Sequence, residues 1–293
     1  MSAPLFATSS RESLSARDFD RIRKLAYDYC GLDIESGKEE LVASRLGKIM
    51  RQLGILSYGA YFDYVVADKT SQALITMIDS LTTNHTSFFR ERQHFDFLDS
   101  TVFPALAGRQ QIDIWSAASS SGEEPYSVAF AARDFYGPTG PVVRILATDI
   151  STRILETAKK ATYDTQRLSS VPKDVLQRHF LRGAGPASSL YRVKPEVRAT
   201  VRFQRLNLIE SFSGINTAFP LILCRNVMIY FNAATQEELI ERFYQQMEPG
   251  GYLFIGHSES LNRIQHRFEY ICPAIYRKPG ALKGARASRG EVA

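Results

Sequence analysis

The feature that most constrains this sequence is a series of short apolar runs, each followed by polar or small residues and then by a helical pattern. The runs are Ile112–Trp115, Val142–Ala147, Pro220–Cys224 and Tyr252–Ile255. A β-branched or aliphatic run of this length predicts a buried strand. Strands that alternate with helices are typical of βα units. We therefore expect an α/β fold whose parallel sheet is covered by helices on both faces.

Residues 16–82 show only helical spacing. Ser15, with Asp18 three residues later, predicts a helix start, and Gly31 predicts its end. A second helix is expected from about Lys38 to Gly54, and two shorter ones over 58–66 and 74–81. The sequence thus predicts an all-helical N-terminal domain over 16–82, a linker over 83–98 and a larger domain over 99–278.

A small antiparallel β insertion is expected within the larger domain, over residues 176–205. Two runs there have the character of strands, Leu190–Val193 and Ala199–Arg205. The turn Pro249-Gly250-Gly251 is expected to precede a further strand, Tyr252–Ile255. The first 15 residues and residues 279–293 have compositions that predict disorder.

Composition excludes several classes of protein. With 44% apolar and 23% charged residues, the chain can bury a large core, which argues against global disorder. No run approaches the length of a membrane span, so no membrane insertion is expected. Three cysteines without CxxC spacing favour a reducing compartment and argue against a zinc cluster, so we expect a cytoplasmic protein without a metal.

Positive charge is concentrated in one segment. Residues 165–205 contain nine Lys and Arg against two Asp and Glu, whereas the whole chain has a net charge of +5. Such a block favours an acidic partner, either a nucleic acid or an acidic protein surface, although a solvated face would look the same. Its few aromatic residues (Phe180, Tyr191, Phe203) argue against base stacking and so against a nucleic acid.

The loop after the first predicted strand points to a particular ligand. Ligands of open α/β sheets lie beyond the carboxyl ends of the strands. The loop 116–122 is neither a GxGxxG motif nor a P-loop, and Glu123 and Glu124 follow it at a helix start, where they would repel a phosphate. Asp149, which ends the second strand, is placed to bind a ribose diol. A positively charged nucleoside without phosphate describes S-adenosyl-L-methionine. The alternatives are ordinary helix N-terminal charge for the glutamates and a turn-forming aspartate for Asp149.

Several longer motifs carry a family resemblance. They are Leu81-Thr-Thr-Asn-His-Thr-Ser-Phe-Phe-Arg90, Trp115-Ser-Ala-Ala-Ser-Ser-Ser-Gly-Glu-Glu-Pro-Tyr-Ser127, Ala147-Thr-Asp-Ile150, Cys224-Arg-Asn-Val-Met-Ile-Tyr-Phe231 and Gly256-His-Ser-Glu259. In this order they resemble the CheR family, the chemotaxis receptor glutamate O-methyltransferases. The resemblance extends from about Asp18 to Arg277.

The resemblance implies a Rossmann-like S-adenosylmethionine-dependent methyltransferase domain with the helical domain and the β insertion. It implies cofactor contacts at Asn84, Thr86, Arg90, Glu124, Asp149, Asn207, Leu208, Arg225 and Asn226. It also implies substrate docking by a basic helix, which corresponds to Arg45, Lys48 and Arg51. The β-subdomain binds a receptor C-terminal tether peptide in some members, and the loop 183–191 resembles theirs in length but not in sequence.

The transfer itself needs little acid–base chemistry, because the methyl group is activated and a glutamate is already ionised at pH 7. We expect Arg90 to orient the attacking carboxylate and Tyr230 to assist with its hydroxyl. Cys224 lies in an apolar run and is read as a buried strand residue rather than a nucleophile. The expected partners are the cytoplasmic domains of membrane chemoreceptors, with recruitment to receptor arrays. The alternatives are a methyltransferase acting on RNA or another acidic substrate, and a non-catalytic adaptor.

Overall fold

The computed structural model describes residues 13–82 and 85–280. The predicted disordered segments 1–15 and 279–293 lie almost entirely outside this part of the chain. The chain divides into two compact units, one of Met1–His85 with Tyr230–Thr235 and one of Thr86–Ile229 with Gln236–Ala293. Within the described residues, no helix combines the length and the apolar character that crossing a membrane requires.

The helical unit contains the four helices predicted from the sequence: α1 (Ala16–Cys30), α2 (Glu39–Leu53), α3 (Tyr58–Ala67) and α4 (Gln72–Leu81). The Ser15 hydroxyl accepts the Asp18 N–H and begins α1, and Gly31, with φ 74°, ends it in the left-handed conformation that glycine adopts without strain. The expected capping pattern is confirmed. Ile22, Ala26, Leu46 and Met50 are fully buried among these helices.

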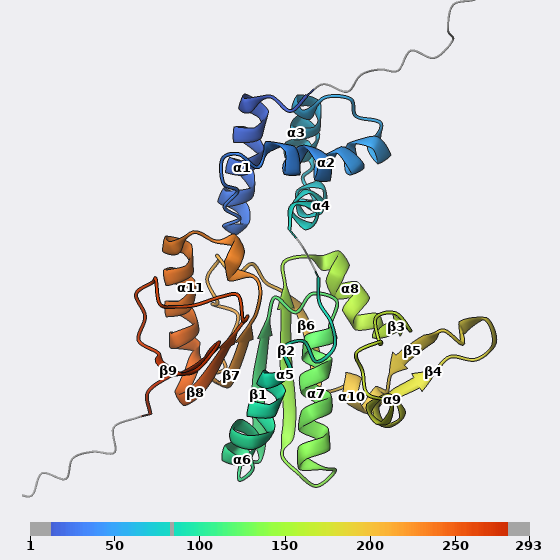
Figure 1. The fold of residues 1–293 in the computed structure, drawn as a ribbon, viewed down its shortest axis with the longest axis vertical. Coiled ribbons are helices and arrows are strands. Elements are labelled where there is room, and N and C mark those ends of the chain that lie inside the picture. Colours follow the sequence, from blue (N-terminus) through green and yellow to red (C-terminus); the bar gives the residue numbers. More distant parts are fainter. Residues whose placement is uncertain (1–12, 83–84, 281–293) are drawn as a thin grey trace, which may run out of the picture. The chain divides into compact units, whose positions relative to one another are not determined.

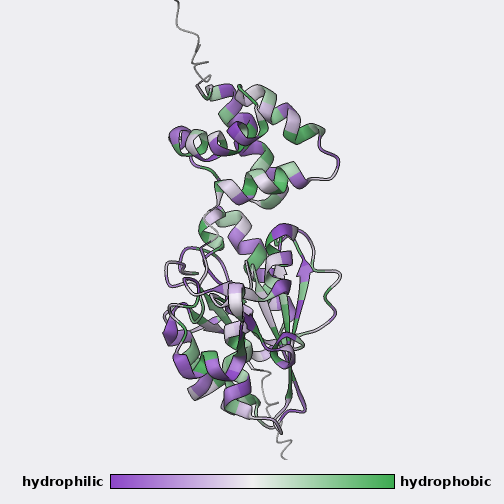
Figure 2. Ribbon diagram, turned by 90° about the vertical axis from the view of Figure 1, so that its right-hand side faces the viewer, coloured by the Kyte–Doolittle hydropathy of each residue, from purple (hydrophilic) through white to green (hydrophobic). Residues whose placement is uncertain are grey.

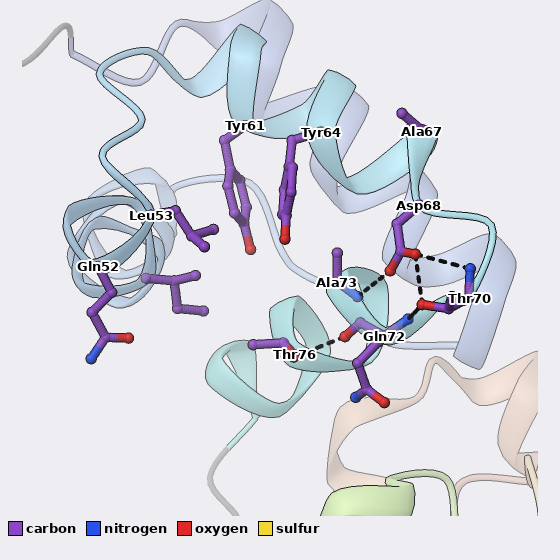
Figure 3. A pocket seen from close by; sticks show the side chains of 11 residues that line it. Gln52, Leu53, Tyr61, Tyr64, Ala67, Asp68, Thr70, Gln72, Ala73 and Thr76 are labelled. Carbon is purple, nitrogen blue, oxygen red and sulfur yellow. Dashed lines mark hydrogen bonds between the residues drawn. The ribbon is translucent and has the colours of Figure 1, made fainter.

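A groove of about 580 Å³ lies between α2, α3 and α4 (Figure 3). Tyr61 and Tyr64 project into it from α3, and Leu53 faces them from α2. Asp68 lies at one end of the groove. Its carboxylate accepts the backbone N–H groups of Thr70 at 2.9 Å and Ala73 at 2.7 Å. These hydrogen bonds lower the pKa of Asp68 and hold the turn that leads into α4.

The second unit is built on a sheet with the strand order β6-β2-β1-β7-β8-β10-β9 (Figure 1). Its strands are β1 (Gln111–Ala117), β2 (Val142–Asp149), β6 (Val201–Arg205), β7 (Phe219–Cys224), β8 (Met247–Ile255), β9 (Glu269–Cys272) and β10 (Ile275–Arg277). The strands from β6 to β8 are parallel, whereas β10 pairs antiparallel with β8 and β9. The chain leaves β1 toward β2 and β6 on one side and returns to β7 on the other. The strand order therefore reverses between β1 and β7.

Helices cover both faces of this sheet, as predicted. Ile114 of β1 packs into the core cluster that includes Phe130 of α7 (Glu123–Tyr136). Trp115, the next residue, points to the other face, where its ring lies 5.3 Å from that of Phe243 on α11 (Ala233–Gln246). Figure 2 shows the strands as largely hydrophobic. Four further helical segments of this unit are α5 (Arg92–Phe97), a π-helical turn (Leu98–Val102), α6 (Phe103–Leu106) and α8 (Thr152–Lys160).

A small antiparallel sheet is present, and the predicted run Leu190–Val193 is its central strand, but its other strands differ from the prediction. Its order is β3-β5-β4, from β3 (Thr162–Asp164), β5 (Leu190–Val193) and β4 (Phe180–Arg182). Along the chain, α9 (Lys173–His179) lies between β3 and β4, and α10 (Pro195–Arg198) follows β5. The run Ala199–Arg205, predicted as a strand of the insertion, instead contains β6, which pairs in parallel with β2. Val201 and Phe203 of β6 pack on the main core, and that burial decides which sheet the strand joins.

The predicted turn at Pro249-Gly250-Gly251 also differs, because these residues lie within β8. The pairing of β7 with β8 shifts register between Phe219 and Leu221, which accommodates Gly250 at φ 82°. The sheet thus absorbs the Pro-Gly-Gly sequence as an irregularity of the strand.

Candidate active site

The carboxyl ends of β1 and β7 adjoin at the reversal of strand order, with Ala117 opposite Cys224. Such a switch point is where open α/β sheets bind ligands. The loop after β1 is tightly wound, and Ala118, Ser120 and Gly122 all have positive φ. A side chain at Gly122 would begin only 2.9 Å from the Tyr163 hydroxyl, so the loop requires glycine there.

Asp149 at the end of β2 is fixed by two backbone N–H groups. One carboxylate oxygen accepts from Ser120 at 2.9 Å and the other from Ser151 at 3.0 Å. Asp149 therefore ties the loop after β1 to the start of α8. A carboxylate at the end of the second strand is where open α/β sheets of this kind bind a ribose diol.

The two glutamates at the start of α7 have different environments. Glu123 is fully buried and accepts from the Ser121 hydroxyl at 2.7 Å and from Arg167 at 3.1 Å. Glu124 instead accepts from the Ser116 hydroxyl at 2.7 Å. Of the pair, Glu124 faces the ends of β1 and β7.

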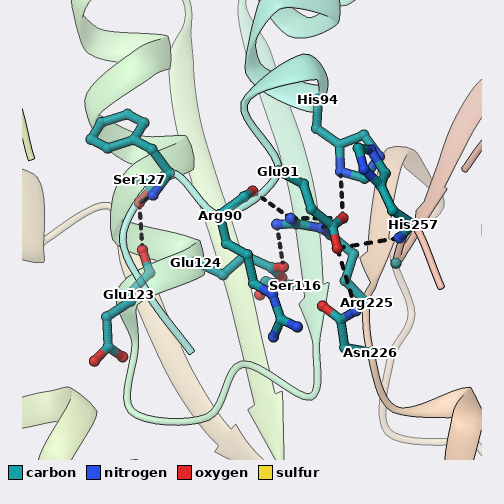
Figure 4. Close-up of polar contacts among 12 residues, drawn as sticks. Arg90, Glu91, His94, Ser116, Glu123, Glu124, Ser127, Arg225, Asn226 and His257 are labelled. Atoms are coloured by element: carbon teal, nitrogen blue, oxygen red, sulfur yellow. Dashed lines mark hydrogen bonds and ion pairs between the residues drawn. The ribbon is translucent and has the colours of Figure 1, made fainter. Parts of the chain in front are cut away.

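Arg225 is the centre of the site (Figure 4), and its side chain is only 2% exposed. Nη1 donates to Glu124 at 3.0 Å, and Nη2 donates to Glu91 at 3.0 Å. Nη2 also donates to the backbone carbonyl of Arg90. A guanidinium buried between two carboxylates is stable only while both partners stay in place, because an uncompensated buried charge costs several kcal/mol.

Glu91 is a site residue that the sequence reasoning missed. Besides Arg225, its carboxylate accepts from the Asn226 side-chain amide at 3.3 Å and from the His257 backbone N–H at 3.2 Å. Burial tends to raise the pKa of Glu91, but the charge of Arg225 and the hydrogen bonds from His257 and Arg225 lower it overall. Its only signal in the sequence was its place next to Arg90, and a glutamate at a helix start is common without any function.

Glu259 is a second residue whose role the sequence did not reveal, although it ends one of the motifs. It is 9% exposed, and the backbone N–H groups of Asn226 and Ile229 donate to it at 2.9 and 3.3 Å. Burial raises the pKa of Glu259 in spite of these bonds. This carboxylate holds Asn226 in its left-handed conformation, φ 60°, directly after Arg225.

His94 of α5 lies beside this network. It is 1% exposed, and its Nδ1 is 3.5 Å from a Glu91 oxygen. Burial, followed by the charge of Arg225, lowers the pKa of His94 to about 3, so the ring is neutral. Figure 4 shows His94 and His257 next to each other above Glu91.

The remaining predicted cofactor residues lie in three places. Asn207 and Leu208 are buried directly after β6, where the Asn207 amide donates to Glu210 at 3.1 Å. Thr86 is half-buried at the start of the second unit, and Asn84 lies outside the described residues. The structure thus brings Arg90, Glu124, Arg225 and Asn226 together, with Asp149 connected through the loop after β1; their contacts with a cofactor stay predictions.

Tyr230 and the basic helix belong to the helical unit. The Tyr230 carbonyl accepts the Asp33 N–H at 2.8 Å, and its catalytic role stays a prediction. On α2, Lys48 and Arg51 are exposed, whereas Arg45 is half-buried and donates to the carbonyl of Leu81 at the end of α4. Of the three basic residues, only Lys48 and Arg51 are exposed on the surface, whereas Arg45 connects α2 to α4.

Cys224 is fully buried, and burial raises its pKa well above the usual value, with smaller contributions from Glu259 and Glu124. A thiol in this state is a poor nucleophile. Its place in the middle of the sheet agrees with the interpretation as a strand residue.

Comparison with known proteins identifies the family. Residues 17–82 match the model of the CheR methyltransferase all-alpha domain, and residues 84–276 match that of the CheR methyltransferase SAM-binding domain. The chain is 40% identical over 268 residues to the chemotaxis protein methyltransferase of Klebsiella aerogenes, covering 92% of this chain and 91% of that protein. It is 38% identical over 259 residues to chemotaxis protein methyltransferase 2 of Pseudomonas aeruginosa (88% and 92% covered), and 37% identical over 272 residues to the Escherichia coli protein (93% and 94% covered).

These matches confirm the resemblance stated from the motifs, and they cover both units. The fold at the switch point and the family models agree on a domain that binds S-adenosyl-L-methionine. The chain belongs to the CheR family of S-adenosylmethionine-dependent methyltransferases.

Proposed function

We propose that this protein transfers a methyl group from S-adenosyl-L-methionine to glutamate side chains on the cytoplasmic helices of chemoreceptors, forming glutamate methyl esters in chemotaxis adaptation. The observation that carries the proposal is the buried Arg225, held between Glu91 and Glu124 at the switch point. These two carboxylates and one guanidinium leave a net negative charge at the carboxyl ends of β1 and β7, where it favours a cationic ligand. The relatives of this chain are named as chemotaxis protein methyltransferases.

The residues at the switch point fit the cofactor. Asp149 stands at the carboxyl end of β2, where a carboxylate suits the ribose hydroxyls, and it is tied to the loop after β1 through the Ser120 N–H. Glu124 places negative charge where a cationic ligand would lie. When bound, the cofactor supplies a methyl group activated by its sulfonium. Thr86, Asn207 and Leu208 complete the proposed contacts.

The chain's own contribution to catalysis is orientation. A glutamate substrate is already ionised at pH 7, so no residue has to remove a proton. Arg90 orients the attacking carboxylate, and Tyr230 assists with its hydroxyl. The Arg90 carbonyl accepts from Arg225, so the backbone of this residue is fixed by the same network that fixes Glu124. Positioning of this kind lowers the activation free energy by up to several kcal/mol.

Receptor binding is assigned to two surfaces. Lys48 and Arg51 are exposed on α2 and suit the acidic face of a receptor helix. On the insertion, β4 is an edge strand whose free side can pair with an extended peptide such as a receptor C-terminal tether. With these partners, the proposal is that the protein acts in the cytoplasm and is recruited to membrane receptor arrays.

The structure weakens the case for an RNA substrate. Several basic residues of the segment 165–205 are engaged within the chain: Arg167 with Glu123, Arg178 with Asp134 and Asp174, and Lys194 and Arg198 with backbone carbonyls. Side chains held in this way are less available to phosphates. RNA therefore serves as the competing outcome of the test.

The test uses methyl-labelled S-adenosyl-L-methionine, the purified protein and membranes that contain chemoreceptors, with an RNA-only reaction in parallel. Label on membrane protein that is released as methanol by mild alkali supports the proposal, because only carboxyl esters are cleaved in this way. Alkali-stable label on RNA would overturn it. Absence of transfer to either, with intact cofactor binding by calorimetry, would instead support an adaptor.

A further inference from the structure

His94 is a buried imidazole, and a Glu91 oxygen lies 3.5 Å from its Nδ1, too far for a well-formed hydrogen bond. The residue is 1% exposed, and neither ring nitrogen has a hydrogen-bond partner. The ring lies between Phe254, at 5.0 Å, and the ring of His257, at 4.9 Å. Buried nitrogens are almost always satisfied in folded proteins, so an unsatisfied pair requires an explanation such as a bound ion.

Two further donor groups surround the ring. One ligand atom from each of Glu91, His94 and His257 can be chosen so that all three lie within 4.8 Å of one another. In a tetrahedral site with metal–ligand bonds of about 2.0–2.2 Å, ligand atoms are roughly 3.3–3.6 Å apart. The His257 side chain is exposed and can rotate to close the remaining distance, while His94 and Glu91 are held by packing and hydrogen bonds. The exposed side of His257 also gives an ion a path from solvent.

The donor set indicates which ion. Two imidazoles and one carboxylate are typical ligands of Zn²⁺ and its neighbours in the first transition series, whereas Mg²⁺ and Ca²⁺ prefer oxygen alone. Arg225 competes with a metal ion for Glu91, since its guanidinium donates to the same carboxylate. It keeps Glu124, at 3.0 Å, as a counter-ion when Glu91 turns to a metal.

We propose that Glu91, His94 and His257 form a binding site for a divalent transition metal of the Zn²⁺ class, and that its occupancy weakens cofactor binding. The coupling follows because an ion on Glu91 takes an acceptor from Arg225, which holds Glu124. Binding linkage makes the effect reciprocal, so the cofactor also weakens metal binding. Only the coupling rests on the proposed function; the metal site does not.

The first test measures metal binding to the full chain. Zn²⁺ is titrated against a chromogenic chelator, and Co²⁺ replaces it in a second experiment to give a visible absorption spectrum that reports nitrogen coordination. We expect one ion per chain, with affinity reduced about tenfold or more in His257→Gln and His94→Gln. His266→Gln, a histidine of the same unit outside the cluster, is the matched control and is expected to bind as the unaltered chain does.

His94 is buried and its variant can lose stability, so the exposed His257 decides the question. Equal Zn²⁺ affinity in His257→Gln and His266→Gln would overturn the site, as would the absence of Zn²⁺ binding to the unaltered chain.

The second test measures S-adenosyl-L-methionine affinity by calorimetry with and without Zn²⁺. We expect a weaker affinity with Zn²⁺ in the unaltered chain and no such change in His257→Gln. Zn²⁺ binding with unchanged cofactor affinity would overturn the coupling alone. Failure to bind the cofactor even without Zn²⁺ would count against the proposed function instead, so the two failures are distinguishable.

Discussion

The Glu91→Gln substitution tests whether the buried ion pairs hold the active site together. The side chain keeps its shape but loses its charge, and the amide nitrogen that replaces one carboxylate oxygen cannot accept a hydrogen bond. Glu91 receives donors on both oxygens, Arg225 on one and Asn226 with His257 on the other. One of these sets therefore loses its acceptor whichever way the amide is turned.

The expected cost follows from burial. Arg225 and Glu91 are 2% and 12% exposed, and removing one partner of a buried pair costs about 3–5 kcal/mol. Because Glu124 still balances Arg225, we expect the lower end, about 3 kcal/mol. The total stability of a domain is about 5–15 kcal/mol, so the loss is readily measured.

The assay is urea unfolding followed by tryptophan fluorescence. The chain has one tryptophan, Trp115, which is fully buried in β1 and so reports on the second unit alone. Glu248→Gln is the matched control, because Glu248 binds Arg109 through two hydrogen bonds of 3.0 and 2.7 Å but with side chains 28% and 39% exposed. An exposed pair of this kind contributes about 0–1 kcal/mol.

The two variants separate geometry from burial, since both remove a carboxylate that makes two hydrogen bonds to an arginine. If Glu91→Gln destabilises the second unit no more than Glu248→Gln does, the reasoning from burial is wrong. A loss of cofactor affinity without a loss of stability would also contradict it, because the network is argued to act through the fold.

Three more predictions follow from the site and the helical unit. Asp149→Ala is expected to weaken S-adenosyl-L-methionine binding by about 1–3 kcal/mol in calorimetry, and unchanged affinity would remove its assignment to the ribose. Lys48→Ala combined with Arg51→Ala is expected to raise the KM for receptors and leave cofactor affinity intact; an equal rise in Lys24→Ala, on α1, would show a nonspecific effect of charge. Burial lowers the pKa of His179 below its usual 6.5, so the native state binds fewer protons than the unfolded state, and stability present above pH 6.5 is lost as the pH falls below it. The decrease in urea midpoint between pH 7.5 and 5.5 is expected to be smaller in His179→Gln, and an identical decrease would count against the prediction.

Local patterns predicted most of the regular structure. The four N-terminal helices and the strands β1, β2 and β7 follow from periodicity and capping, because both depend only on residues a few positions apart. The pair Glu123 and Glu124, and Asp149, could be singled out for the same reason, since they stand at the start of a helix and at the end of a strand. The choice of Glu124 from the pair depended on the family resemblance.

Contacts between distant segments could not be predicted in this way. Glu91 and Arg225 are 134 positions apart, and their pairing depends on which strands adjoin in the finished sheet. The strands β3 and β4 have three residues each, too few to show a period, and β6 was misplaced because an apolar alternation does not say which sheet will cover it. The missing information was in each case topological.

The place of the small β-sheet has an evolutionary consequence. One segment between α8 and β6 carries β3, α9, β4, β5 and α10. On either side of it the chain belongs to the main sheet, where β2 pairs with β6 over five consecutive residues from Ile145↔Val201 onward. The entry and exit of the segment are thus set by the main sheet, not by its own sequence. Loops within it can lengthen, shorten or change charge while the pairing of β2 with β6 is retained. Exchange of this one segment would change the binding preference and leave the fold of the methyltransferase domain unchanged.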